Sequence, residues 1–101
     1  MFGTIARLRI KPGMKPELKK VMAQDELASI PGWVADYVFE STDDPDECYL
    51  VAFFSDQETY TANADSPEQH ERYLKMRACL LEDPEWHDGS IISATGPRAV
   101  R

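Results

Sequence analysis

The stretch Glu47-Cys-Tyr-Leu-Val-Ala-Phe-Phe-Ser55 predicts a β-strand whose two sides are both apolar. Alternate side chains of a strand point to opposite sides of the sheet. The two sets are Cys48, Leu50, Ala52 and Phe54 on one side and Tyr49, Val51 and Phe53 on the other. Because both sets are apolar, both should be covered, as in an interior strand. Helices can cover one side in a chain of 101 residues, so we expect a second copy of the chain to cover the other.

The composition indicates one small acidic domain. The 101 residues are 43% hydrophobic and carry a net charge of −7, from 18 acidic and 11 basic side chains. This length is typical of a single domain, which we assign to residues 1–101 with a free tail at 97–101. Nucleic acid and anionic membranes bind clustered Lys and Arg, so the charge argues against both partners.

The cysteines and the first residues indicate a cytoplasmic protein. Cys48 and Cys79 are too few for a disulfide framework and lie in apolar segments, which predicts buried free thiols in a reducing compartment. The first residues have no basic region and no long apolar run, so we expect no signal peptide. No apolar stretch approaches the ~20 residues that a membrane span needs.

The residues before the opening strand predict a strand, a helix and a second strand. Residues 2–11 alternate, and the side that should face helices carries Phe2, Thr4, Ala6, Leu8 and Ile10. A helix should begin near Lys15 and end at Ile30-Pro31-Gly32. Residues 33–41 alternate again, with one mixed side that suits an edge strand and with Trp33, Ala35, Tyr37 and Phe39 on the other. An acidic turn at residues 42–46 then makes a hairpin with the opening strand.

The residues after the opening strand predict a broken helix and a last strand. Ser55 and Glu58 have the spacing of a capping box. Ser66-Pro67 starts a second helical piece, which should run to about residue 82. Residues 86–89 should form a turn, and residues 90–95 the last strand.

This element order is β-α-β-β-α-β, the ferredoxin-like arrangement of the α+β class. The right-handed crossover rule places the first and third strands in the middle of a four-stranded antiparallel sheet. Helices then cover one face, and the other face would leave Val51 and Phe53 in water. Each large apolar side chain left exposed forfeits about 1.5–3 kcal/mol. We therefore expect a homodimer through the open face of the sheet.

The sequence lacks the spacings that hold metals or phosphates. It has two His and two Cys, with no His-x-x-x-His or Cys-x-x-Cys pair, so no metal site is expected. Glycine-rich phosphate motifs and the Gly-x-Ser-x-Gly nucleophile elbow do not occur either.

The candidate site lies on the broken helix, where polar side chains gather at Tyr60, Asn63, His70 and Tyr73. If both helical pieces lie on the sheet, these residues edge a cavity with apolar walls from Phe2, Leu8, Trp33, Phe39 or Phe54. An apolar cavity with a few polar groups is typical of a small-molecule site. His70 can act as a base near neutral pH. Asn63 and a tyrosine hydroxyl can donate hydrogen bonds to a developing oxyanion.

Each of these residues also has a purely structural interpretation. His70 can be a surface or capping residue, and Asn63 a helix C-cap. The tyrosines can be core aromatics with a wet hydroxyl. Arg77 is either a substrate contact or the partner of a surface acid, and Trp33 is either a ligand contact or a core residue. Side chains that point into a closed cavity would favour an enzyme, whereas side chains that face solvent would favour a binding module.

Five segments of the chain resemble one known family. They are the strand at residues 2–10, Ile30-Pro-Gly-Trp33, Phe54-Ser-Asp-Gln-Glu-Thr-Tyr60, Ala62-Asn-Ala-Asp-Ser-Pro-Glu-Gln-His70 and Asp83-Pro-Glu-Trp-His-Asp-Gly89. Together they span about residues 2–96 and resemble the antibiotic biosynthesis monooxygenase (ABM) family.

The resemblance implies a dimeric α+β barrel. It also implies oxygenation of a small aromatic or quinol-type substrate without metal, flavin or any other cofactor. The catalytic residues would be His70, Asn63 and Tyr73. The substrate-binding residues would be Tyr60, Trp33 and Arg77.

A related branch of the family degrades haem with an Asn on the first strand, a Trp on the short helix and a His on the next helix. This chain has Ala6 and Arg7, Asn63 and Tyr73 near those places, which disfavours haem breakdown. Two alternatives to the monooxygenase stay open. One is a non-catalytic dimeric module that binds a small apolar or aromatic ligand or assists another enzyme. The other is a different reaction of the same barrel, such as isomerisation, cyclisation or, despite these departures, haem breakdown.

Overall fold

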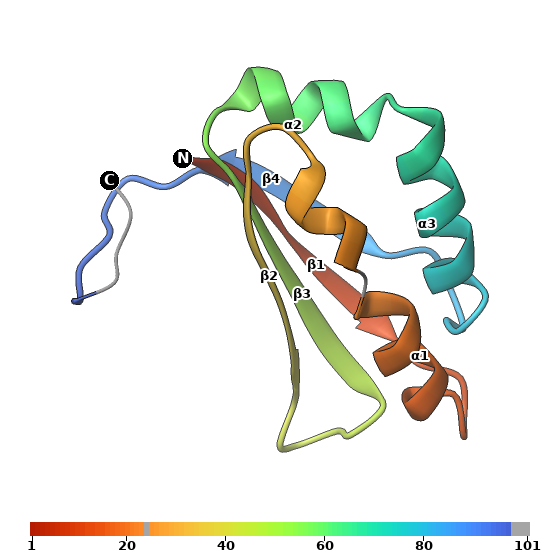
Figure 1. The fold of residues 1–101 in the computed structure, drawn as a ribbon. Helices are drawn as coiled ribbons and strands as arrows, with labels where there is room; N and C mark the ends of the chain where they lie inside the picture. The colour runs from red at the N-terminus through yellow and green to blue at the C-terminus, as the bar shows by residue number, and fades with distance from the viewer. Residues whose placement is uncertain (24, 98–101) are drawn as a thin grey trace.

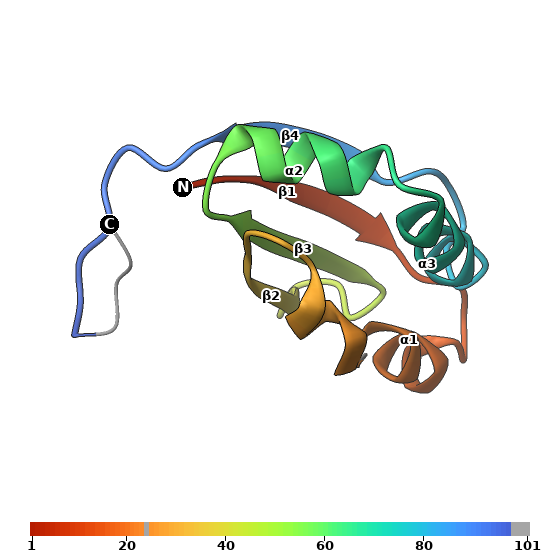
Figure 2. The ribbon, with the colours of Figure 1, turned by 45° about the horizontal axis from the view of Figure 1, so that its top comes forward.

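Helices cover one face of a β-sheet and leave the other face bare (Figures 1 and 2). The computed structural model describes residues 1–23 and 25–97. In chain order the elements are β1 (Phe2–Arg9), α1 (Lys15–Met22), the 3-10 helix η1 (Asp25–Ser29), β2 (Trp33–Glu40), β3 (Glu47–Phe54), α2 (Gln57–Ala64), α3 (Pro67–Arg77) and β4 (Glu85–Ser90). Of the predicted tail, only Pro97 lies among the described residues.

The sheet has four antiparallel strands in the order β2-β3-β1-β4. β1 pairs with β3 from Phe2 opposite Phe54 to Arg9 opposite Glu47, and β4 pairs along the other side of β1. The interior positions of the first and third strands confirm the ferredoxin-like prediction, as does the edge position of β2.

The covered face holds the hydrophobic core. Ala6, Leu8 and Ile10 of the first strand region are at most 1% exposed, which confirms the side that the alternation predicted to face helices. Cys48 and Cys79 are free thiols buried in the same cluster. Burial raises the pKa of both thiols, because the charged thiolate is poorly solvated there.

The bare face carries large apolar side chains. The exposed fractions are 50% for Ile5, 62% for Tyr37 and 53% for Phe39. The rings of Phe39 and Tyr49 stack with their centroids 5.3 Å apart. Arg7 forms an ion pair with Glu47 at the same face, and this interaction lowers the pKa of the Glu47 carboxyl.

The last strand lies earlier than the sequence pattern predicted. β4 is Glu85–Ser90, so the predicted turn at residues 86–89 is part of the strand, and residues 91–95 form no strand. The pattern was misleading because all six β4 residues are exposed. Hydrogen bonds to the edge of β1, rather than burial of alternate residues, define this strand.

The first and last helices are shorter than predicted. α1 ends at Met22 and the separate turn η1 precedes Ile30, whereas one helix was expected to reach Ile30. α3 ends at Arg77 rather than near residue 82. None of the described helices is long and apolar enough to cross a bilayer.

The two helix starts of the second half differ in how well they were predicted. Ser66 caps α3, with its hydroxyl accepting a hydrogen bond from the backbone N–H of Gln69 at 3.1 Å, as expected. α2 is capped by Asp56 instead of Ser55, because the Asp56 carboxylate accepts from the backbone N–H of Thr59 at 2.8 Å. A charged oxygen is the stronger acceptor at a helix N-terminus.

Candidate functional site

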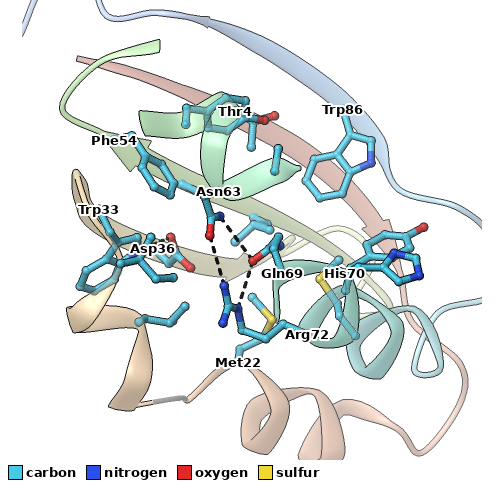
Figure 3. Close-up of a pocket in the computed structure, with 18 of the residues that line it drawn as sticks. Thr4, Met22, Trp33, Asp36, Phe54, Asn63, Gln69, His70, Arg72 and Trp86 are labelled. Carbon is cyan, nitrogen blue, oxygen red and sulfur yellow. Dashed lines mark hydrogen bonds between the residues drawn. The ribbon is translucent and has the colours of Figure 1, made fainter. Parts of the chain in front are cut away.

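A cavity of about 480 Å³ lies between the helices and the covered face of the sheet (Figure 3). This volume is within the range of ~300–1,000 Å³ that holds small-molecule ligands. The apolar part of its lining is contributed by Val21, Met22, Leu27, Ile30, Leu50, Ala52, Phe54 and Met76. Strands therefore form the floor, and α1, η1, α2 and α3 form the walls.

Two of the five predicted wall residues, Trp33 and Phe54, line this cavity. Leu8 belongs to the core cluster, and Phe39 lies on the bare face. Phe2 packs behind the lining, with its ring centroid 5.1 Å from that of Tyr60.

Trp33 reaches the cavity because β2 is irregular at its start. The register shifts between Trp33 opposite Phe54 and Ala35 opposite Phe53. An extra residue in one strand turns the preceding residue to the other side of the sheet. Trp33 therefore shares a side with Asp36, although strict alternation had put the two on opposite sides.

Gly32 holds the start of β2 close beneath α2. Its φ of +78° lies in the left-handed region, and a Cβ atom there would lie 2.2 Å from the Thr59 hydroxyl oxygen. Only glycine combines this backbone conformation with so close an approach. The backbone N–H of Ser55 also donates to the Gly32 carbonyl at 2.7 Å, which ties β2 to the end of β3.

Asp36 places a half-buried carboxyl in the cavity wall. The indole Nε1 of Trp33 donates a hydrogen bond to its Oδ1 at 2.9 Å. Burial raises the pKa of Asp36, while the Trp33 hydrogen bond and the charge of Arg72 act in the opposite direction.

Arg72 is held over the cavity by two amide side chains. Its Nε donates to Oε1 of Gln69 at 3.1 Å, and its Nη2 donates to Oδ1 of Asn63 at 3.2 Å. Asn63 also donates from Nδ2 to Gln69 Oε1 at 3.4 Å (dashed lines in Figure 3). The two amides therefore fix the positively charged guanidinium of Arg72 at the cavity wall. Its Nη1 makes no hydrogen bond with any described residue.

Tyr60 and Asp88 form a second polar group of the lining. The Tyr60 hydroxyl donates to Asp88 Oδ1 at 2.8 Å, and burial together with this carboxylate raises the pKa of Tyr60 to about 12. The nearby Thr4 hydroxyl has a smaller effect and lowers the pKa of Tyr60. Thr4 is only 4% exposed, and its hydroxyl has no hydrogen bond of normal geometry within the described residues.

His70 lies on the side of the cavity opposite Trp33 (Figure 3). Its side chain is exposed. Tyr73 is half-buried, and its ring centroid lies 6.4 Å from that of Trp86. His70 therefore borders solvent, whereas Tyr73 belongs to an aromatic wall.

The structure brings five of the six predicted site residues to one cavity: Tyr60, Asn63, His70, Tyr73 and Trp33. Arg77 lies elsewhere. Its Nε donates to Asp83 at 2.7 Å, and its Nη1 donates to the Leu80 carbonyl at 2.9 Å. These bonds hold the chain where α3 ends.

Sequence reasoning did not name Asp36 or Arg72 as site residues. The available signal for Asp36 was a single carboxyl within the otherwise apolar run of residues 33–39. Arg72 gave no comparable signal, since a basic residue in a helix is usually solvated and its amide partners come from two different helices. Within residues 1–23 and 25–97, no group of three or more His, Cys, Asp and Glu side chains is arranged to hold a metal ion.

The fold and the cavity define a ferredoxin-like α+β domain with a cavity of small-molecule size between helices and sheet. The sequence profile of the family described as antibiotic biosynthesis monooxygenase matches residues 1–73. The chain therefore belongs to the antibiotic biosynthesis monooxygenase family. No curated protein sequence matches it.

Solved structures show the same fold at low sequence identity. SnoaB, a cofactor-independent oxygenase from Streptomyces nogalater, is 18% identical with a TM-score of 0.79, over 96% of this chain and 97% of SnoaB. A proposed antibiotic biosynthesis monooxygenase from Chloroflexus aurantiacus is 21% identical with a TM-score of 0.75, over 94% and 96% of the chains. A conserved protein from Methanosarcina mazei is 16% identical with a TM-score of 0.77, over 87% and 89%.

Proposed function

We propose that this chain is a cofactor-independent monooxygenase of a small aromatic or quinol-type substrate. The observation that carries the proposal is the cavity of about 480 Å³, whose apolar lining is interrupted by a few polar side chains. Membership of the family and the similarity to SnoaB support the same reaction class. The apolar walls suit an aromatic ring, and the polar groups suit its oxygen substituents.

The reaction needs no reductant other than the substrate. A ring CH₂ group that becomes C=O loses four electrons, and O₂ accepts them. One oxygen atom enters the product and the other leaves as water, so that AH₂ + O₂ gives A=O + H₂O. The protein has to accept a substrate proton and to stabilise the anion that reduces O₂.

Several lining residues can supply these functions. The candidates for proton acceptance or hydrogen bonding are His70, Tyr73, Asp36 and Asn63. Tyr60 and Trp33 would contact the ring system, since both present aromatic surface to the cavity. Arg77 is outside the proposal because its hydrogen bonds lie outside the cavity lining.

The chain is also proposed to form a homodimer through its bare face. The exposed side chains of Ile5, Tyr37 and Phe39 form an apolar surface that a second copy would remove from water. Two bare faces packed together would enclose Val51 and Phe53 as well, which gives the barrel that the family resemblance implies.

The first test is oxygen consumption with a panel of hydroquinones, anthrones and flavonols. The metal-free protein should consume O₂ above the spontaneous rate, in equal amounts with the product formed. Ala52→Phe should abolish this activity by filling the cavity, since Ala52 lines it. Ala62→Phe is the matched control, because Ala62 is exposed on α2 outside the lining. A chain that binds these compounds without consuming O₂ would be the non-catalytic binding module instead.

A further inference from the structure

We propose that Asp36 is the proton acceptor of the cavity and that its substrate carries a phenolic hydroxyl, whose anion Arg72 stabilises. The inference rests on the proposed function and assigns roles to two residues that the sequence analysis did not name as site residues. Both line the cavity, and they come from different elements, β2 and α3.

The carboxyl of Asp36 has one oxygen occupied and one available. Trp33 Nε1 donates to Oδ1 at 2.9 Å, and this bond fixes the plane and direction of the group. Oδ2 accepts no hydrogen bond from any described residue. An oriented acceptor with a free oxygen in an apolar cavity selects a ligand with a hydroxyl donor, because an unpaired polar group costs free energy there.

Arg72 supplies the positive charge that the reaction requires. Asn63 and Gln69 hold the guanidinium through their carbonyl oxygens, so it is positioned before any ligand enters. It acts on Asp36 through space rather than as a hydrogen-bonded ion pair. A ligand oxygen between the two groups would face an acceptor on one side and a fixed cation on the other, which is the arrangement that stabilises a developing oxyanion.

The proton balance of the step is simple. The substrate O–H bond breaks, an O–H bond forms on Asp36 Oδ2, and the electron pair stays on the substrate oxygen as phenolate. The charge of the cavity is unchanged, because the carboxylate becomes neutral as the phenolate forms. The proton is returned when the second oxygen atom of O₂ leaves as water.

Other charged groups near Asp36 do not replace Arg72 in this role. On the α1 side, Lys15, Lys19 and Glu40 border a separate hollow next to Asp36. Lys15 and Glu40 form an ion pair there. Across the main cavity, Asp88 accepts a hydrogen bond from the Tyr60 hydroxyl through Oδ1, and both Asp88 and His70 are exposed. Asp36 is thus the half-buried carboxyl of the lining with a free oxygen, and burial favours its role as a base by raising its pKa.

The test combines binding and turnover of Asp36→Asn. The amide keeps an oxygen for Trp33 but presents an N–H in place of Oδ2. With dihydroxyanthraquinone as a probe and its dimethyl ether as the matched ligand, the wild type should prefer the hydroxyl form at least ~10-fold, and the variant should lose that preference. Oxygen consumption with a hydroxyanthrone should fall by about 10²–10⁴ in kcat, and its KM should rise because the preference for the hydroxyl form is lost.

The pH profile distinguishes a base from a structural residue. The carboxylate form must be present, so kcat/KM should fall as the pH falls through the pKa of Asp36. Trp33→Phe removes a hydrogen bond to that form and should move this acidic limb to higher pH by about one unit. Arg72→Gln should move it in the same direction, whereas Arg72→Lys should not. The matched control is Asp43→Asn, which makes the same chemical change on the exposed β2–β3 turn and should leave all values unaltered.

Each outcome decides between the two proposals. Full oxygenase activity in a folded Asp36→Asn would overturn the assignment and leave the monooxygenase intact. Wild-type selectivity for the hydroxyl probe, lost in Asp36→Asn but without any O₂ consumption, would support the binding role and reject the monooxygenase. A wild type that binds both probes equally, or neither, would reject Asp36 as the acceptor.

Discussion

The two faces of the sheet are built from the same strands but end in different environments. On the covered face of β3, Cys48, Leu50 and Phe54 are 3%, 6% and 3% exposed. On the bare face the neighbouring strand leaves Tyr37 62% and Phe39 53% exposed. One face already has its core and a cavity, whereas the other has apolar side chains with no cover within the described chain.

The apolar composition of a strand face therefore does not establish that the face is buried within a single chain. Both faces of β3 are apolar, yet helices α1, α2 and α3 lie on one of them only (Figure 2). The covered face should therefore set the stability of the single chain, and the bare face should set its association.

The largest expected difference is between Leu8→Ala and Ile5→Ala, two changes on β1 that probe opposite faces. Leu8 is 0% exposed, and its truncation should lower the free energy of unfolding by about 2–5 kcal/mol at every protein concentration. Ile5 is 50% exposed, and its truncation should lower mainly the part of the free energy of unfolding that depends on protein concentration. Urea unfolding at several concentrations measures both. Equal losses at the lowest concentration would contradict the distinction between the faces.

The next effect concerns association. Phe53→Asp places a charge on the bare face of both copies, and the lost burial of two aromatic side chains, about 3–6 kcal/mol, should weaken a dimer by roughly 10²–10⁴-fold. Sedimentation would then show monomer or aggregate at concentrations where the wild type is a dimer. Thr61→Asp adds the same charge to an exposed position of α2 and should not change the mass. A normal dimer of Phe53→Asp would refute the proposed interface.

A smaller effect separates the two helix starts above the covered face. Ser66→Ala removes the side-chain cap of α3 and should reduce stability by about 1 kcal/mol. Ser55→Ala, which the sequence pattern had favoured as a cap, should stay within about 0.5 kcal/mol because Asp56 caps α2. Chemical denaturation gives both values. Equal losses would mean that Ser55 contributes to the helix start after all.

The smallest effect is spectroscopic. Burial and the Asp88 carboxylate raise the pKa of Tyr60 to about 12, so its phenolate should appear in ultraviolet titration well above the ordinary tyrosine value near ~10. Because the folded pKa is raised, the contribution of Tyr60 to stability is complete below the ordinary tyrosine value near ~10 and is lost as the pH rises through about 12. Asp88→Asn should lower the transition. An unshifted transition in Asp88→Asn would show that the carboxylate has no influence.

Much of the fold could be predicted from the sequence because buried strands show their periodicity directly. The alternation of residues 2–10 indicated the covered side, and the right-handed crossover rule, in agreement with the two apolar sides of β3, indicated the strand order. β4 could not be located in the same way, since all six of its residues are exposed and only its hydrogen bonds to β1 define it.

The candidate site was harder to predict than the fold. Tyr60, Asn63 and Tyr73 line the cavity, and they could be predicted as candidates because helical spacing can be read from sequence. Asp36 and Arg72 depend on distances between elements, which no local pattern contains. Trp33 was predicted as a possible wall residue of the cavity. That it lies on the same side of the sheet as Asp36 follows from a register shift, which alternation cannot reveal.

That register shift makes residues 33–36 a transferable unit. The acid and the indole that orients it are three positions apart in one edge strand, and neither belongs to the buried core cluster. Protein engineers could exchange these four positions as one cassette and retune what the cavity accepts, with the remaining scaffold unaltered. The same arrangement would let a lineage acquire new substrate preferences through a few local substitutions.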